Sequence, residues 1–186
     1  MMKLLLKSIN GLYNKFVLKK NKVQYKSIFI NGRIIVFGNI VIGSNVSVNS
    51  GIRYNPIGGS ERTMLITHGN GKISIGNNVG ISNTAIVSAE SIVIDDNVMI
   101  GGSCKIYDTD FHSIRYEYRM QKPDTHIKTA PVHIKEGAFI GAHSIILKGV
   151  TIGKHSVIGA GSVVTKSVPD GEIWAGNPAH FIRKVQ

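Results

Sequence analysis

Cysteine, tryptophan and acidic residues are scarce in this chain of 186 residues. It has one Cys and one Trp, and its 22 Lys and Arg outnumber its 11 Asp and Glu. A single cysteine excludes a framework of internal disulfides and is typical of a reducing compartment. Because 42% of the residues are hydrophobic and only 18% are charged, the composition predicts one folded domain with a sizeable core.

Long apolar runs are also missing. None reaches the roughly 18–20 residues that a membrane-spanning helix needs. Residues 1–16 (MMKLLLKSINGLYNKF) are interrupted by polar residues too often for the apolar core of a signal peptide, and no small-residue cleavage site follows. We therefore expect a cytoplasmic protein.

Acidic residues are absent from residues 1–60, which hold nine Lys and Arg. The remaining 126 residues carry 13 basic and 11 acidic side chains and are close to neutral. Nucleic-acid binding needs a basic surface on the folded body, and no nucleic-acid-binding motif is present, so we expect no nucleic-acid partner. A local basic segment fits an anionic membrane surface better.

Aliphatic residues recur every six positions through most of the chain. The series comprises Ile30, Val36, Ile42, Val48, Ile75, Ile81 and Val87, then, after one extra residue, Ile94, Ile100, Ile106, Ile134, Ile140, Ile146, Ile152, Ile158 and Val164. A period of six fits neither a helix nor a simple alternating strand. It predicts an all-β prism of short strands joined by sharp corners. Three faces make one coil, and stacked coils lie about 4.8 Å apart.

The position three residues after each start favours residue types that tolerate a positive φ angle. These expected corner residues are Asn45, Gly51, Asn78, Asn97, Gly137, His143, Gly149, His155 and Gly161. Cys104 falls on an inward-facing position and is expected to be a buried small hydrophobe. Two segments, residues 54–72 and 107–133, break the period. The second is rich in aromatic, charged and His residues, which predicts a protruding functional loop.

Residues 1–22 predict a basic amphipathic helix. Its apolar positions are Leu4, Leu5, Ile9, Leu12, Tyr13, Phe16 and Val17, and its lysines are Lys3, Lys7, Lys15, Lys19 and Lys20. Two compatible interpretations are open: a cap over the open end of the prism, or peripheral attachment to an anionic membrane. We assign residues 1–25 to this helical segment and 26–186 to the repeat domain, with residues 170–186 as a C-terminal tail.

The sequence resembles the hexapeptide-repeat acyltransferases, and most closely the sugar and xenobiotic O-acetyltransferases, a group that contains galactoside and maltose acetyltransferases. The resemblance covers residues 30–186 and is strongest over residues 140–185, where GSVVTKSVPDG is followed by AGNPA. It implies a left-handed parallel β-helix of about five coils that assembles as a homotrimer. It also implies acetyl transfer from acetyl-CoA, with no metal required.

The resemblance further implies the residues that carry the chemistry. His112, in YDTDFHSI, matches the catalytic His, which takes the proton of the acceptor hydroxyl during direct attack on the thioester. Asp110 or Asp108 could hold its imidazole tautomer, or could instead shape the loop. Asn83 matches an Asn that binds the acceptor sugar. The expected coenzyme A contacts are Gly141, Ala142 and Ala160 along the pantetheine, and Thr165, Lys166 and Arg183 near the phosphates.

The acceptor is less well defined by the sequence. The basic N-terminal segment favours a saccharide hydroxyl of a capsule, exopolysaccharide or lipopolysaccharide unit, modified at the inner face of a membrane. N-acetylation of an amino sugar and acetylation of a xenobiotic or antibiotic are alternatives within the same class. A non-enzymatic β-helix scaffold is an alternative from another class. A γ-class carbonic anhydrase is disfavoured, because no two of the seven His residues have the five-residue spacing of its zinc ligands.

Overall fold

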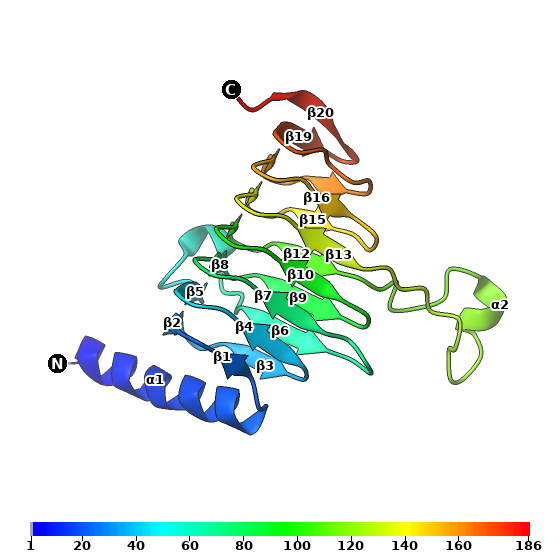
Figure 1. Ribbon diagram of the computed structural model, residues 1–186. Helices are drawn as coiled ribbons and strands as arrows, with labels where there is room; N and C mark the ends of the chain where they lie inside the picture. The colour runs from blue at the N-terminus through cyan, green and yellow to red at the C-terminus, as the bar shows by residue number, and fades with distance from the viewer. Residues whose placement is uncertain (1) are drawn as a thin grey trace.

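The computed structural model describes residues 2–186, with side chains from residue 7 onward. Three parallel sheets form the faces of a left-handed β-helix, and a helix lies across its N-terminal end (Figure 1). Sheet A contains β1 (Gln24–Tyr25), β4 (Ile40–Ile42), β7 (Ile73–Ile75), β10 (Ile92–Ile94), β13 (Val132–Ile134) and β16 (Thr151–Ile152). Sheet B contains β2 (Ile28–Gly32), β5 (Val46–Ser50), β8 (Gly80–Ser82), β11 (Met99–Ile100), β14 (Phe139–Ile140), β17 (Val157–Ile158), β19 (Glu172–Gly176) and β20 (Ala179–Lys184). Sheet C contains β3 (Ile35–Phe37), β6 (Met64–Thr67), β9 (Ala85–Ser88), β12 (Lys105–Tyr107), β15 (Ile145–Ile146) and β18 (Val163–Val164).

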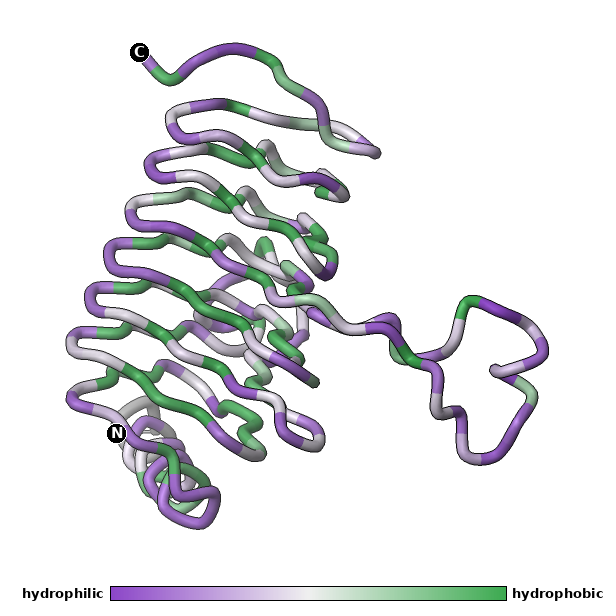
Figure 2. Tube along the Cα trace, turned by 45° about the vertical axis from the view of Figure 1, so that its right-hand side comes forward, coloured by the Kyte–Doolittle hydropathy of each residue, from purple (hydrophilic) through white to green (hydrophobic). Residues whose placement is uncertain are grey.

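The chain visits sheets A, B and C in turn, so each coil has an A–B, a B–C and a C–A corner. Sheets A and C each have six strands, and the prism therefore has six coils, one more than expected. The strands are hydrophobic and most of the corners hydrophilic (Figure 2). This alternation around each coil confirms the all-β prism that the period of six predicts.

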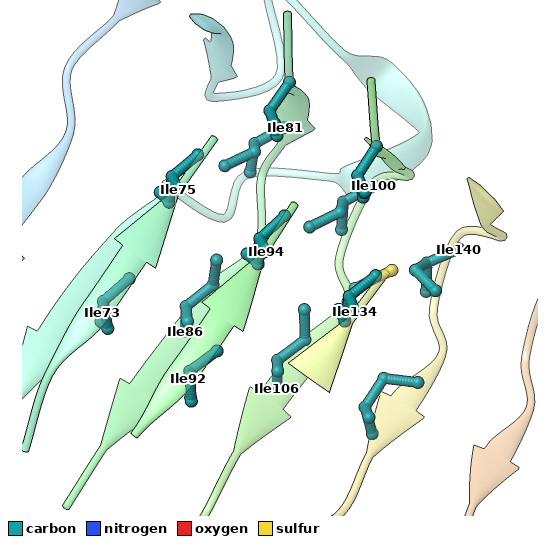
Figure 3. Close-up of a cluster of buried hydrophobic side chains, with 14 of the residues drawn as sticks. Ile73, Ile75, Ile81, Ile86, Ile92, Ile94, Ile100, Ile106, Ile134 and Ile140 are labelled. Atoms are coloured by element: carbon teal, nitrogen blue, oxygen red, sulfur yellow. The ribbon is translucent and has the colours of Figure 1, made fainter. Parts of the chain in front are cut away.

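Stacked isoleucines fill the interior of the prism (Figure 3). In sheet A, Ile94 pairs with Ile75 on one side and with Ile134 on the other, and all three are buried. In sheet C, Ile106 pairs with Ile86 and Ile146 in the same way. β-branched side chains have few χ1 rotamers to lose in a strand, so these columns pack at a low entropic cost.

The corner prediction is confirmed at all nine positions, whose φ angles lie between 54° and 96°. The phase of the repeat, in contrast, is wrong at two places. Ile86 rather than Val87 is buried, because Asn83 adopts a positive φ and turns the chain one residue early. The expected interruption at residues 54–72 also contains strand β6, whose Leu65 is buried between β3 and β9. The true insert is residues 51–63, which contain the short 3-10 helix η1 (Pro56–Gly58).

Helix α1 (Met2–Lys20) caps the first coil. Its buried Asn14 donates from Nδ2 to the carbonyl of Gly32 and accepts from the amide of Ile34, at 2.8 and 3.2 Å. Leu12 and Phe16 point away from the prism and are 68% and 64% exposed. The side chains of Leu4, Leu5 and Lys3 lie outside the described part of the structure. Within residues 2–186, no helix is long and apolar enough to cross a bilayer.

A long arm, residues 108–131, leaves the C–A corner between β12 and β13 and stands away from the prism (Figures 1 and 2). Its two sides pair as an antiparallel ribbon, since the amide of Asp110 donates to Lys128 and the amide of Ala130 donates to Asp108. Short helix α2 (Tyr116–Arg119) lies at its outer end. At the C-terminal end of the prism, β19 and β20 form an antiparallel pair that covers the last coil.

Candidate active site

His112 lies on the outgoing side of the arm, and its side chain is 73% exposed. A tight turn presents it: the amide of His112 donates to the carbonyl of Asp110 at 2.7 Å. The preceding residue, Phe111, has a φ of 60°, which is costly for a bulky side chain. Phe111 is held there by an edge-to-face contact with Tyr107, whose ring centroid is 5.3 Å away. Such strained residues cluster at functional sites.

The carboxylate nearest the His112 ring belongs to Asp124, on the returning side of the arm. Its Oδ2 lies 3.8 Å from His112 Nδ1 and accepts a 2.7 Å hydrogen bond from the amide of Ser113. The Asp124 side chain is only 12% exposed, and its buried Oδ1 has no partner among the described residues. A separation of 3.8 Å is outside hydrogen-bond range, but it gives a direct charge contact when the imidazole is protonated.

The two aspartates expected to orient His112 have other partners. Asp110 Oδ1 lies 2.7 Å from Lys148 Nζ and ties the base of the arm to the next coil. Asp108 is fully buried and accepts hydrogen bonds from the Ser88 hydroxyl and from the amides of Ala89 and Glu90. Both carboxylates therefore anchor the arm, and Asp124 rather than Asp110 or Asp108 is the aspartate beside the His112 ring. Sequence reasoning missed Asp124 because its position depends on how the arm folds back.

Asn83 also differs from its expected role. Its side chain is fully buried at the B–C corner of the third coil. Its Oδ1 accepts from the amide of Gly51 at 2.8 Å, and its Nδ2 donates to the carbonyls of Asn55 and Gly59. The amide group is thus used in holding the insert, and it presents no free polar atom to an acceptor sugar.

Gly141, Ala142 and Ala160 stack at the B–C corner of the last two coils. A Cβ on Gly141 would lie 2.5 Å from the amide nitrogen of Ala160, so these coils can approach only because this residue is glycine. The Gly141 amide is used, since it donates to the carbonyl of Ile158 at 2.7 Å. The amides of Ala142 and Ala160 donate to no protein acceptor in the described chain. They are main-chain donors of the kind that would fit the amide groups of a pantetheine arm.

The expected phosphate contacts lie elsewhere on the surface. Thr165 and Lys166 follow β18 at the C–A corner, one coil beyond Lys148, and Arg183 lies on β20. All three of these expected contacts are exposed. One chain therefore places His112, Thr165 and Lys166 at one corner and the pantetheine contacts at another. It does not bring the expected site together.

Cys104 has no place in this site. It is fully buried at the B–C corner, and its Sγ lies 3.2 Å from the carbonyl of Gly141. Burial raises the pKa of its thiol, which disfavours the nucleophilic thiolate. No cluster of three or more His, Cys, Asp or Glu suited to a metal occurs in the described residues.

Comparisons with known proteins agree with this architecture. Residues 131–166 match the family described as bacterial transferase hexapeptide (six repeats). A galactoside O-acetyltransferase from Escherichia coli K12 is 38% identical over 103 residues, which make up 55% of this chain and 49% of that protein. This chain thus spans about half the length of that curated relative.

Two solved structures cover nearly the whole chain. A maltose O-acetyltransferase from Clostridium difficile superposes with a TM-score of 0.62 and 26% identity, covering 98% of this chain and 85% of that one. A variant of an N-acyltransferase from Bacillus cereus, solved with dTDP and coenzyme A, has a TM-score of 0.72 and 27% identity, covering 94% and 91%. These findings confirm the resemblance seen in the sequence: residues 131–166 match the hexapeptide-repeat transferases, and the chain has the β-helix fold of a maltose O-acetyltransferase and an N-acyltransferase.

Proposed function

We propose that this protein is an acetyl-CoA-dependent O-acetyltransferase that acts on a saccharide hydroxyl. The observation that carries the proposal is an exposed imidazole, His112, held beside a carboxylate on an arm that stands clear of the prism. The names of the relatives support the reaction class. The free main-chain amides of Ala142 and Ala160 support coenzyme A as the carrier of the acetyl group.

In the proposed reaction, His112 Nε2 takes the proton of the acceptor hydroxyl as its oxygen attacks the thioester carbonyl. The tetrahedral intermediate collapses with cleavage of the C–S bond, and the imidazolium returns the proton to the departing thiolate. Asp124 faces Nδ1, so its negative charge stabilises the imidazolium that forms when Nε2 takes the proton. No acyl-enzyme forms, in agreement with the burial of Cys104.

The site is completed by a second chain in a homotrimer. His112 and the two free amides lie at different corners of one prism, so they can meet only if the C–A corner of one chain faces the B–C corner of another. The arm is suited to that contact because it exposes large apolar side chains, with Ile114, Tyr116 and Met120 each more than 60% exposed. Exposed apolar residues concentrated on one projection are typical of an interface.

A second candidate activity is N-acylation of an amino sugar. The Bacillus cereus N-acyltransferase supports it, since its TM-score exceeds that of the maltose O-acetyltransferase. An amine would attack the same thioester with the same base, so the two activities differ only in the acceptor. Parallel assays of hydroxyl-sugar and amino-sugar acceptors, with release of free coenzyme A as the readout, separate them.

Binding of the donor tests the proposal without knowledge of the acceptor. Acetyl-CoA should raise the melting temperature of the protein in a saturable manner, because a ligand of the folded state shifts the unfolding equilibrium. Lys166→Ala and Arg183→Ala should weaken that stabilisation, whereas Lys72→Ala, which removes an exposed lysine from another coil, should not. The absence of a shift at millimolar acetyl-CoA would overturn acetyl-CoA as the donor.

A further inference from the structure

An open pocket of about 400 Å³ lies at the B–C corner of the first two coils, between α1 and the insert. Three arginines from separate segments line it: Arg33 from the corner after β2, and Arg53 and Arg62 from the two ends of the insert. Asn10 of α1, Tyr54 and Ser60 add polar groups and an aromatic ring. None of the described residues that line the pocket is Asp or Glu.

The guanidinium groups in this pocket have no carboxylate partners. Arg53 and Arg62 are exposed, and neither they nor Arg33 forms an ion pair within the described residues. Glu61, the neighbour of Arg62, is engaged with Lys105 and Ser103, and the hydrogen bond from Lys105 holds the pKa of its carboxyl below the usual range. Three cationic side chains therefore line one pocket, and no carboxylate of the described residues pairs with them.

Arg33 is positioned by α1. Its Nε donates to Asn10 Oδ1 at 2.9 Å, and its guanidinium lies 5.1 Å from the centre of the Tyr13 ring. Such contacts fix the direction of a long side chain and reduce the entropy lost when a ligand binds.

The insert is held just as firmly. Besides the three hydrogen bonds to Asn83, it packs so closely that a Cβ on Gly58 would lie 2.5 Å from the Asn83 side chain. A Cβ on Gly102 would lie 2.8 Å from the Gly58 amide. The pocket is therefore largely formed before any ligand arrives.

The pocket lies on the same corner as Ala142 and Ala160, toward the N-terminal end. The arm leaves the prism after the fourth coil, two to three coils beyond the pocket. At the spacing of neighbouring strands, Arg33 lies roughly 14 Å below the arm along the prism axis, and the insert lies nearer because Glu61 bonds to Ser103 and Lys105 of the fourth coil. A sugar held near His112 of an adjoining chain could carry its linking phosphate to this depth.

We propose that Arg33, Arg53 and Arg62 bind the phosphoryl group of the acceptor, which is therefore a sugar linked to a phosphate or diphosphate. This proposal rests on the transferase function proposed above. Guanidinium groups match phosphate oxygens in planar, two-point hydrogen bonds. A phosphate or diphosphate carries enough charge to neutralise several arginines, whereas one sugar carboxylate would leave two of them unpaired. The sources of such a group are a nucleoside diphosphate sugar and a lipid-linked sugar.

The test measures binding of inorganic pyrophosphate by calorimetry, with excess acetyl-CoA present so that donor phosphate contacts are already filled. Arg53→Gln and Arg62→Gln are suitable variants because both side chains are exposed and the fold does not depend on them. Each should weaken binding by about 10- to 100-fold, the value of a charge-assisted hydrogen bond. Lys72→Gln removes the same charge outside the pocket and should bind like the wild type. Undetectable binding, or equal binding by all four proteins, would overturn the proposal.

Two further measurements identify the source of the phosphate. Tighter binding of dTDP or UDP than of pyrophosphate, lost in both arginine variants, assigns the pocket to nucleotide-linked sugars. Tighter binding of a soluble short-chain phosphatidic acid than of pyrophosphate, lost in the same variants and kept by Lys72→Gln, assigns it to a lipid-linked sugar. Stabilisation by acetyl-CoA is measured separately. If the protein binds pyrophosphate but is not stabilised by acetyl-CoA, the proposed transferase function is contradicted. The anion site is then still supported.

Discussion

At the scale of single residues, the proposed chemistry depends on His112 and on what surrounds it. The imidazole is exposed, its backbone is held by a strained turn at Phe111, and Asp124 is the one carboxylate of the described arm that approaches its ring. Asp110 and Asp108, which are nearer in sequence, serve as anchors. Asp110 and Asp108 therefore build the arm, and His112 and Asp124 are the groups proposed to act on substrate.

Replacing His112 should remove the base and leave the fold intact. We expect His112→Ala to lower turnover by roughly 10²–10⁴-fold, the usual contribution of a general base, while acetyl-CoA still stabilises the protein. Steady-state kinetics with an accepted sugar provide the measurement. Turnover equal to that of the wild type would contradict the assignment.

Asp124 is expected to act through His112. Asp124→Asn should lower kcat by at least about tenfold with little change in the KM for acetyl-CoA, and Asp124→Glu should restore part of the loss. Asp170→Asn, which alters an exposed carboxylate away from the arm, is the matched control. If Asp124→Asn changed only the melting temperature, Asp124 would be a structural residue of the arm.

At the scale of elements, the insert and α1 are the two additions that distinguish the N-terminal coils. The insert depends on one buried amide, that of Asn83, and α1 depends on the buried Asn14. Both contacts satisfy backbone groups that a bare corner or an edge strand would leave without partners.

Truncating Asn83 should destabilise the insert more than a corner substitution alone. Asn83→Ala leaves the amide of Gly51 and two carbonyls without partners, at about 1–3 kcal/mol for each group that stays buried. Asn97→Ala is the matched control because Asn97 also has a positive φ but is exposed. Urea unfolding should show the larger loss for Asn83→Ala. Equal losses of unfolding free energy in the two variants would mean that Asn83 contributes only its positive φ and not its side-chain hydrogen bonds.

The outward face of α1 tests the membrane interpretation. Ile9, Leu12 and Phe16 are exposed on a helix that ends in Lys19 and Lys20, a pattern typical of helices that lie on anionic lipid. Phe16→Glu should abolish sedimentation with anionic vesicles. Phe181→Glu, at the other end of the molecule, should not. A full-length protein that ignores such vesicles would leave α1 as a cap alone.

Much of the fold could be predicted because the repeat imposes one rule on many residues. The period of six located the faces, and the need for a positive φ located nine corners. The prediction fails where contacts between residues far apart in sequence set the geometry. Asn83 turns the chain early, so that Ile86 is buried in place of Val87, and β6 lies within the segment predicted to interrupt the repeat. Asp124 was missed for the same reason, since only the folded arm brings it to His112.

At the scale of the whole molecule, the expected site residues fall on two corners of the prism. If the site forms between chains, two different inactive variants can complement each other. Coexpressed His112→Ala and Ala160→Trp should assemble into mixed trimers in which about a third of the interfaces pair two intact halves, because each chain contributes one half to each of two interfaces and only one of the three combines an intact His112 with an intact Ala160. Activity per trimer should recover to about that fraction of the wild type.

Two differently tagged copies of His112→Ala, coexpressed in the same way, supply the baseline. Mixed trimers are isolated through both tags. A lack of activity in the isolated trimers therefore cannot result from a failure of the two variants to assemble with each other. Mixed trimers without activity would show that His112 and Ala160 act within one chain.

The stacking of coils fixes the distances between sites along the prism axis. Each turn of the prism adds a fixed step of about 4.8 Å, so distances along the axis are set by counting turns. The arginine pocket belongs to the first two turns, and the arm leaves after the fourth. If the pocket binds the phosphate of the acceptor, as proposed, the number of repeats sets the length of acceptor that reaches from the pocket to the arm. A protein that gained or lost one repeat between these points would accept a longer or shorter acceptor without a change in any proposed catalytic residue.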